Sequence, residues 1–377
     1  MTVMIKCFAW PLLTLLLSCT TGETSRHTLS EGKVIEGASM ASPRSGHTAT
    51  LLPNGKVMIA GGMNGNGSYS DGVEIFDPAA NSFTATRNMS AQRVGHTATL
   101  LPDGKVLIAG GFHGEYVQGA ELYDPATTRF SPTGPLNAPR SDHVAVLLGN
   151  GKVLLIGGVG VGYSFLATAE IYDPATGKFT NTGNMTTARE GHTATLLKNG
   201  KVLVAGGHKD RREAMTVFSS AELYDPATGR FTATGDMTVV RHKHAAVLLS
   251  DGNILIAGGS DKRDSRGQYA SAEIYEPEKG TFKSIGDMNS ARYKLAGAMV
   301  LLQDGRALVA GGSPRVEVYD PAKKSFAVVN GELDSARFFS SATLLNDGRV
   351  LIAGGYGDHG AATTQTWVYK PLKVSSP

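Results

Sequence analysis

The strongest constraint on the fold is a unit of roughly 50 residues that occurs seven times along the chain. A Gly-Gly pair marks each copy, and the first glycines of these pairs are residues 61, 110, 157, 206, 258, 311 and 354. An Asn-Gly or Asp-Gly dipeptide precedes every pair by a few residues. Such dipeptides favour the tight turn of a β-hairpin, because both residues tolerate positive φ. The period therefore predicts a repeat architecture built from one hairpin-containing unit.

Each copy has the pattern of four β-strands and shows no helical periodicity. In the second copy, the alternating run His96–Leu101 predicts a first strand, and the aliphatic run Lys105–Ala109 predicts a second strand that ends at the glycine pair. The third strand is Glu121–Asp124, which a proline ends, and the fourth begins at Phe130. Four antiparallel strands in each of seven copies predict an all-β, seven-bladed β-propeller.

The shared positions resemble the kelch repeat. They are an arginine followed by a histidine in the first strand, the Gly-Gly pair after the second strand, and Tyr-Asp-Pro at the end of the third. The resemblance covers residues 33–371 and implies a propeller of the galactose oxidase/kelch type. We therefore divide the chain into a signal segment (1–18), a linker (19–32), the propeller (33–371) and a short tail (372–377).

Only six complete fourth strands follow a third strand, so the last blade needs an outer strand from elsewhere. The segment Lys33–Met40 precedes Arg44, and Met40 lies at the same offset from its arginine as Met89 does from Arg93. We expect this N-terminal segment to close the last blade, which removes an open sheet edge. The alternative is the C-terminal tail that begins at Leu372.

The first residues have the pattern of an export signal. Lys6 precedes the apolar run Cys7–Leu17, which is the length of a signal-peptide core and too short to span a bilayer. Leu16–Cys19 resembles a bacterial lipobox, which implies that Cys19 is acylated and anchors the chain to a membrane. Thr20 resembles the outer-membrane sorting pattern. The alternative is a secreted protein that is cleaved nearby.

Composition excludes several classes of protein. Charged residues make up 18% of the chain and the net charge is +3 at pH 7, so disorder is disfavoured and no basic footprint for nucleic acid is present. Two cysteines in 377 residues exclude a disulfide scaffold. We expect a monomer that needs no cofactor and no metal.

Two series of repeated polar residues are best interpreted as structural. An arginine occurs in all seven copies and a glutamate in the third strand of six, which predicts one Arg–Glu pair per blade rather than a ring of catalytic groups. Five first strands carry a histidine, and these are His47, His96, His143, His192 and His244. The structural interpretation is a hydrogen bond that each histidine repeats in its blade. The alternative is a partial ring of imidazoles around the channel that binds a metal or an anion.

The candidate binding residues lie in the variable loops. In kelch proteins that bind peptides, contacts come from the residue after Gly-Gly and from the two residues after the arginine. Carried over to this chain, the resemblance implies Phe112, Asp142, Glu190, His208, His242, Lys243, Tyr293, Lys294 and Tyr356. The sixth copy has only four residues, 313–316, between Gly-Gly and the glutamate, so the loop face is asymmetric.

The fourth and fifth copies concentrate cations in these loops. They are Lys209, Arg211, Arg212, Lys262, Arg263 and Arg266, to which Lys243 and Lys294 add two more. One interpretation is a basic sector for an anionic glycan or peptide. The other is a solvated surface of mixed charge, because Asp210, Glu213, Asp261 and Asp264 occur in the same loops.

These patterns favour a non-catalytic binding module of the cell envelope that presents one propeller face to a protein or glycan. The alternative is a carbohydrate-active enzyme, similar to a sugar mutarotase or epimerase, in which Glu190, His208 and His242 transfer protons. A copper radical oxidase is disfavoured. Galactose-oxidase-like enzymes join a tyrosine to a cysteine, and no cysteine follows Cys19.

Overall fold

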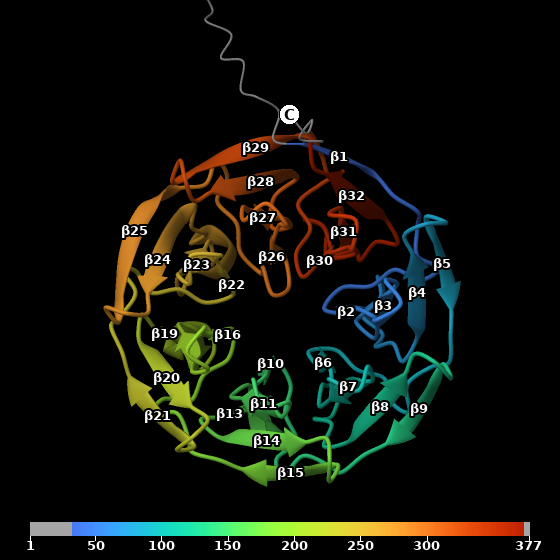
Figure 1. Ribbon diagram of the computed structural model, residues 1–377, viewed down its shortest axis with the longest axis horizontal. Helices are drawn as coiled ribbons and strands as arrows, with labels where there is room; N and C mark the ends of the chain where they lie inside the picture. Colours follow the sequence, from blue (N-terminus) through green and yellow to red (C-terminus); the bar gives the residue numbers. More distant parts are fainter. Residues whose placement is uncertain (1–31, 373–377) are drawn as a thin grey trace, which may run out of the picture.

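The computed structural model describes residues 32–372, which form a ring of β-sheets around a central axis (Figure 1). The predicted signal segment, Cys19 and most of the predicted tail lie outside the described residues. The described helices are short 3₁₀ turns, η1 (Val161–Tyr163), η2 (Arg212–Ala214) and η3 (Asp264–Arg266). None of them is long and apolar enough to cross a membrane. The all-β prediction is confirmed.

Each sequence repeat contributes strands in the predicted order, from the axis outward. The innermost strands are β2 (Thr48–Leu51), β6 (Thr97–Leu100), β10 (Val144–Leu147), β16 (Thr193–Leu196), β22 (Ala245–Leu248), β26 (Met299–Leu301) and β30 (Ser341–Leu344). The second strands are β3 (Val57–Ala60), β7 (Val106–Ala109), β11 (Val153–Ile156), β17 (Val202–Ala205), β23 (Ile254–Ala257), β27 (Ala307–Val309) and β31 (Val350–Ala353).

The outer half of each repeat holds the remaining strands. The third strands are β4 (Val73–Asp77), β8 (Ala120–Asp124), β14 (Ala169–Asp173), β20 (Ala221–Asp225), β24 (Ser271–Glu276), β28 (Arg315–Asp320) and β32 (Thr366–Lys370). The outermost strands are β5 (Ser82–Ala85), β9 (Arg129–Pro132), β15 (Lys178–Asn181), β21 (Arg230–Ala233), β25 (Thr281–Asp287) and β29 (Ser325–Glu332). Two loops add the small hairpins β12 (Val159–Gly160) with β13 (Ser164–Phe165) and β18 (His208–Lys209) with β19 (Thr216–Val217), which the sequence pattern does not predict.

Five of the sheets are four-stranded and antiparallel, and the last two repeats share one eight-stranded sheet. The N-terminal strand β1 (Lys33–Glu36) joins its two halves, because it pairs antiparallel with β32 and parallel with β29 (Figure 1). The pairing with β32 is the one that the sequence predicts for the N-terminal segment. The strand ends at Glu36, before the predicted end at Met40, whose side chain is nevertheless buried against neighbouring strands.

The second strand of each repeat is buried on both faces, which explains its continuous apolar sequence. In β3, Val57 and Ile59 contact one neighbouring sheet, whereas Met58 and Ala60 contact the other. Successive side chains of a strand point to opposite faces, so one strand contributes to two cores. Burial between adjacent sheets therefore supplies the apolar cores of the ring.

The glycine pairs bring each repeat close to the next. The N–H of Gly111 donates to the carbonyl of Arg140 at 2.8 Å, and a Cβ on Gly110 would approach that same oxygen to 2.5 Å. The corresponding bond recurs between successive repeats, and Gly355 of the last repeat donates to Arg44 of the first at 2.9 Å. Only glycine allows this approach, as expected for glycines at strand ends.

The repeated arginines form buried ion pairs inside the repeats, which confirms their structural interpretation. The pairs are Arg44–Glu74, Arg93–Glu121, Arg140–Glu170, Arg189–Glu222, Arg241–Glu273 and Arg292–Glu317. In the last repeat, where Trp367 replaces the glutamate, Arg337 pairs with Asp334 and its guanidinium lies 5.6 Å from the indole centroid.

Candidate functional site

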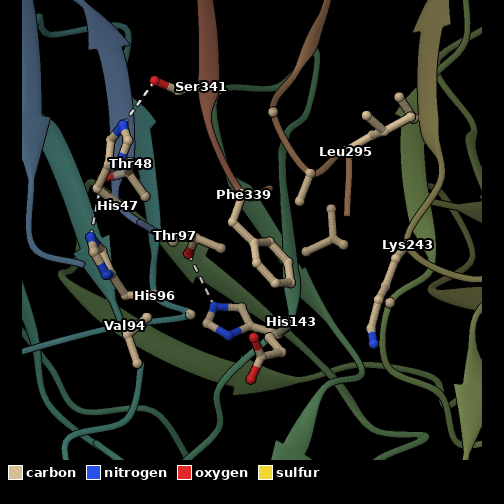
Figure 2. A pocket seen from close by; sticks show the side chains of 18 of the residues that line it. His47, Thr48, Val94, His96, Thr97, His143, Lys243, Leu295, Phe339 and Ser341 are labelled. Carbon is tan, nitrogen blue, oxygen red and sulfur yellow. Dashed lines mark hydrogen bonds between the residues drawn. The ribbon is translucent and has the colours of Figure 1, made fainter. Parts of the chain in front are cut away.

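A cavity of about 800 Å³ lies at the axis of the ring, lined by residues of all the innermost strands. Small side chains such as Ala49, Ala98 and Ala194 form much of its wall. Larger and charged groups also line it, including Val94, Asp142, Glu190, Lys243, Phe339 and Tyr356. Figure 2 shows Val94, Phe339 and Lys243 projecting into this space. The cavity is large enough for a small-molecule or saccharide ligand.

The second residue after each repeated arginine adopts the left-handed conformation. Three of these residues are glycines, Gly46, Gly95 and Gly191, with φ from 61° to 64°. The other four are Asp142 (54°), Lys243 (54°), Lys294 (58°) and Phe339 (52°). A non-glycine residue costs about 1–2 kcal/mol in this conformation. Four different side chains are thus held at strained positions beside the cavity, which is typical of functional sites.

Two carboxyl groups of neighbouring repeats, those of Asp142 and Glu190, line the cavity and interact electrostatically. Asp142 accepts a hydrogen bond from the Ser141 hydroxyl at 2.7 Å. Its pKa is raised because surrounding protein atoms desolvate the carboxylate, although the residue is exposed to the cavity. Desolvation and the charge of Asp142 together raise the pKa of Glu190 to about 7, against the opposing effects of Arg211 and Lys243. Near neutral pH, this pair can therefore both hold and release a proton.

A pair of histidines lies directly behind Glu190. The Nδ1 atoms of His208 and His242 are 3.1 Å apart, and His242 Nε2 is 2.9 Å from the Ser260 hydroxyl. His208 Nε2 lies 3.8 Å from a Glu190 oxygen. Burial lowers the pKa of His208 to about 3 and that of His242 to about 4, so both rings are neutral at pH 7. One Nδ1 must donate to the other, which couples the tautomers of the two rings.

The two lysines at left-handed positions have different surroundings. Lys243 Nζ lies 3.3 Å from a carboxylate oxygen of Asp264. Lys294 Nζ donates to the Tyr356 hydroxyl at 2.6 Å and lies within 6 Å of four ring centroids, those of Tyr293, Phe338, Phe339 and Tyr356. Burial opposes the charge of Lys294, but the tyrosine hydroxyls raise its pKa overall.

A second group of aromatic rings extends from the first to the third repeat. We call Tyr69, Phe112, Tyr116 and Tyr163 the aromatic arc, because their ring centroids follow one another at 5.8, 5.0 and 6.1 Å. Arg211 lies 5.3 Å from the Tyr163 centroid and also contacts Glu190 at 3.3 Å. Arg211 therefore links the Tyr163 end of the aromatic arc to Glu190.

The structure separates the predicted site residues into two groups. Asp142, Glu190, Lys243 and Tyr356 line the cavity. His208, His242 and Tyr293 are buried, because the hairpin loops and the Phe338 ring pack over them. These three side chains lie behind the cavity wall and are not accessible to a ligand. Phe112 lies in the aromatic arc, and Lys294 is held among the rings beside the cavity.

Sequence reasoning missed several residues of this region. Tyr116 and Tyr163 lie in loops whose length and conformation the repeat pattern does not define. Phe339 is different, because it is the second residue after Arg337 and the rule carried over from kelch proteins covers it. Glycine at the same offset in three other repeats signals its left-handed conformation. The connection between Arg211 and Glu190 has no sequence signal, because the two residues lie in different loops.

The cations of the fourth and fifth repeats are partly neutralised. Arg211 pairs with Glu190, Lys243 with Asp264, and Arg263 with Asp261. These contacts agree with the mixed-charge interpretation for this part of the face. Lys294 differs, because its contacts in the described chain are with aromatic rings and tyrosine hydroxyls.

The histidine series forms hydrogen bonds between repeats. Nε2 of His47 lies 2.9 Å from Ser341 Oγ, and His96 and His143 make the same contact, at 3.0 Å, with a threonine of the preceding repeat (Figure 2). His244 makes the equivalent contact with Thr193, also at 3.0 Å. For His192, the residue at the threonine position of the preceding repeat is Val144, which has no hydroxyl, so this contact is not made there. Among those residues, no group of three or more His, Cys, Asp or Glu side chains is arranged to hold a metal.

Comparison with known proteins agrees with the architecture. Residues 43–90 and 139–186 match the family model of the kelch motif. The structure is similar to that of a fungal alcohol oxidase of the AA5 family solved in complex with copper, with a TM-score of 0.73 and 17% sequence identity, over 90% of this chain and 76% of that chain. No curated protein matches the sequence. The motif matches and this likeness support a kelch-type β-propeller.

The copper chemistry of that oxidase does not fit the residues present here. The two histidines that lie together, His208 and His242, hydrogen-bond each other through Nδ1 and are buried. The described chain contains no cysteine that could be joined to a tyrosine. At 17% identity, the likeness describes the fold alone.

Proposed function

We propose that the ring consists of seven blades, one for each sequence repeat, with two blades joined by β1 into the eight-stranded sheet. The innermost strands support this count, because each contacts the next and β30 contacts β2. The glycine-to-arginine hydrogen bonds follow the same order, from Gly62–Arg93 to Gly355–Arg44.

We propose that the protein is a non-catalytic binding module that holds a carbohydrate at the cavity. The observation that carries this proposal is the set of left-handed positions. Asp142, Lys243, Lys294 and Phe339 stand where other repeats have glycine. A side chain gives no benefit to a left-handed backbone, so we infer that these four residues stand beside the cavity in order to contact a ligand.

The chemistry of the surrounding residues favours a carbohydrate. Aromatic rings stack on the apolar faces of sugar rings, and carboxylates accept hydrogen bonds from neighbouring hydroxyls. The aromatic arc and the Asp142–Glu190 pair combine these two features. The cavity is also wide enough for a sugar ring, and its walls carry hydroxyl and small apolar side chains.

The experiment is a glycan array followed by calorimetric titration of the strongest binder. We expect Asp142→Gly to weaken binding at least about tenfold, equivalent to about 1.4 kcal/mol, while the fold is retained because glycine suits this backbone. Lys324→Gly is the matched control. Lys324 is also left-handed, with φ 53°, but lies in the turn between β28 and β29.

Two results would contradict the proposal. The first is wild-type protein that binds no glycan on the array. The second is a glycan that binds Asp142→Gly and Lys324→Gly with equal affinity, since the carboxylate would then make no contribution.

We also propose that the chain is exported and anchored to the cell envelope, at the outer membrane, through acylated Cys19. The apolar run Cys7–Leu17 and the lipobox-like residues Leu16–Cys19 support this location. A secreted, unanchored form is the alternative. A rigid propeller on a lipid anchor would present its cavity face to glycans of the envelope or its surroundings.

A second candidate function is the interconversion of sugar anomers, which the raised pKa values of Asp142 and Glu190 favour. Protonated Glu190 would give its proton to the ring oxygen as the bond from that oxygen to the anomeric carbon breaks. Ionised Asp142 would accept the proton of the anomeric hydroxyl, and closure of the ring would return both protons.

Polarimetry with freshly dissolved aldoses tests this second function. A catalysed rate should fall at least about 100-fold in Glu190→Gln, since general acid catalysis contributes factors of this order. It should also fall as the pH rises above about 7, where Glu190 loses its proton. Wild-type protein that does not accelerate mutarotation of any aldose excludes this candidate and leaves the binding proposal intact.

A further inference from the structure

We propose that Lys294 recognises a carboxylate on the ligand, and that the ligand is a glycan containing uronic acid units. This inference rests on the proposed carbohydrate-binding function and specifies the chemical class of the sugar. Three observations carry it: the surroundings of the Lys294 ammonium, the rigidity of its position, and the shape of the rim beside it.

The first observation is the absence of a carboxylate partner for Lys294 within residues 32–372. Its interactions are with the Tyr356 and Tyr293 hydroxyls and with aromatic faces. The equivalent lysine of the preceding repeat, Lys243, is paired with Asp264, and Arg211 is paired with Glu190. Aromatic rings stabilise a cation without neutralising it. Lys294 therefore keeps a full positive charge and is free to attract an anion.

The second observation is that this charge is held in place before a ligand arrives. Rings from two neighbouring repeats surround Nζ at 4.7–5.8 Å from their centroids. Phe338 and Tyr356 also pack on each other, with centroids 5.4 Å apart. A lysine side chain ordinarily loses considerable rotamer entropy when it binds a ligand. Here the rings restrict the side chain in advance, so little of that cost remains.

The third observation is access to the ammonium from the rim. A short connection, from Val309 to Arg315, joins the second and third strands of the sixth repeat. The corresponding connection of the fourth repeat is longer and runs from Ala205 to Ala221. The connection of the sixth repeat is the shortest of the seven between second and third strands, so the least chain stands at the rim in the repeat of Lys294. Phe339 and Tyr356, which contact the lysine, also line the cavity. An extended ligand can enter over this low part of the rim and reach the cavity past Lys294.

These features favour an acidic glycan over an acidic peptide. The ionised side chains of an acidic peptide accept hydrogen bonds and cannot donate them to Asp142 and Glu190, which line the cavity. A uronic acid chain presents one carboxylate per unit and several neutral hydroxyls. One carboxylate can reach Lys294 while the hydroxyls of another unit donate to the carboxyl pair.

The test is calorimetric titration of the wild-type protein with tetrasaccharides of galacturonic, glucuronic and mannuronic acid, and with the same oligomers after reduction of their carboxylates. We expect at least one acidic oligomer to bind about tenfold or more tightly than its reduced form at low salt, with a smaller difference at high salt. Lys294→Gly should remove this preference, so that the variant binds the acidic and reduced forms with similar affinity. Lys294→Arg should keep most of the preference.

The outcomes separate this inference from the proposed function. If acidic and reduced oligomers bind the wild-type protein equally, and both lose affinity in Asp142→Gly, the role of Lys294 is overturned and carbohydrate binding is retained. Binding of neither form to the wild-type protein would overturn the inference, and an array without binders would overturn the proposed function as well. Tighter binding of a glutamate hexapeptide than of every uronic acid oligomer would overturn the choice of a glycan. Lys324→Gly again controls for the backbone change.

Discussion

Arg140→Ala is expected to lower the free energy of unfolding by about 3–5 kcal/mol, because it leaves Glu170 buried without its partner. Both side chains are fully buried, and their closest atoms are 2.7 Å apart. Arg140 also donates to the carbonyls of Gly157 and Thr168, at 2.9 and 3.0 Å. Its loss therefore removes several hydrogen bonds as well as the ion pair. Urea unfolding monitored by circular dichroism measures the effect.

Lys152→Ala is the matched control for this prediction. Lys152 precedes β11 in the same repeat and pairs with Asp173 at 2.9 Å, but its side chain is 42% exposed. An exposed pair contributes at most about 1 kcal/mol. If Arg140→Ala and Lys152→Ala lower the free energy of unfolding by similar amounts, the buried arginine is not a principal structural element of the repeat.

Deletion of residues 33–40 is expected to destabilise the whole ring. Val34 and Met40 are buried in the cores beside β32, and each contributes about 1.5–3 kcal/mol. The deletion also removes the bond from the Gly37 N–H to the Thr366 carbonyl at 2.8 Å. We expect a lower melting temperature and concentration-dependent aggregation, because β32 becomes an unpaired edge. Differential scanning calorimetry measures the first effect and light scattering the second.

A deletion of the same length, residues 20–27, serves as the control. Adding a peptide of residues 30–42 to the truncated protein should restore part of the lost stability, since the strand pairs through its backbone. An unchanged melting temperature in the 33–40 deletion would mean that β1 is not needed to hold the ring.

The repeat pattern predicts most of the fold because the scaffold is encoded locally in every copy. The hairpin dipeptides, the aliphatic second strands and the glycine pairs each act over a few residues. Seven copies then reinforce one interpretation. The buried Arg–Glu pairs are also predictable, because two residues that recur together are more readily structural than catalytic. The joining of two repeats through β1 and β29 is not predictable from the sequence, since it depends on the three-dimensional position of the N-terminal segment.

The candidate site is less predictable because it depends on contacts between different loops. Glu190 and His208 can be chosen by their positions in the repeat, but the burial of His208 behind the wall follows from the hairpin of β18 and β19. The rings around Lys294 come from two repeats, and no spacing in the sequence indicates them. The left-handed positions are an intermediate case, since glycine at Gly46, Gly95 and Gly191 signals the conformation that the other repeats share.

The most direct test of the central claim is the variant in which Asp142, Lys243, Lys294 and Phe339 are all replaced by glycine. Every repeat then has glycine at the left-handed position, so the account predicts a melting temperature within about 5 °C of the wild type. It also predicts the loss of binding to the best glycan of the array. Retained affinity in this folded variant would contradict the claim that these four side chains form the binding site.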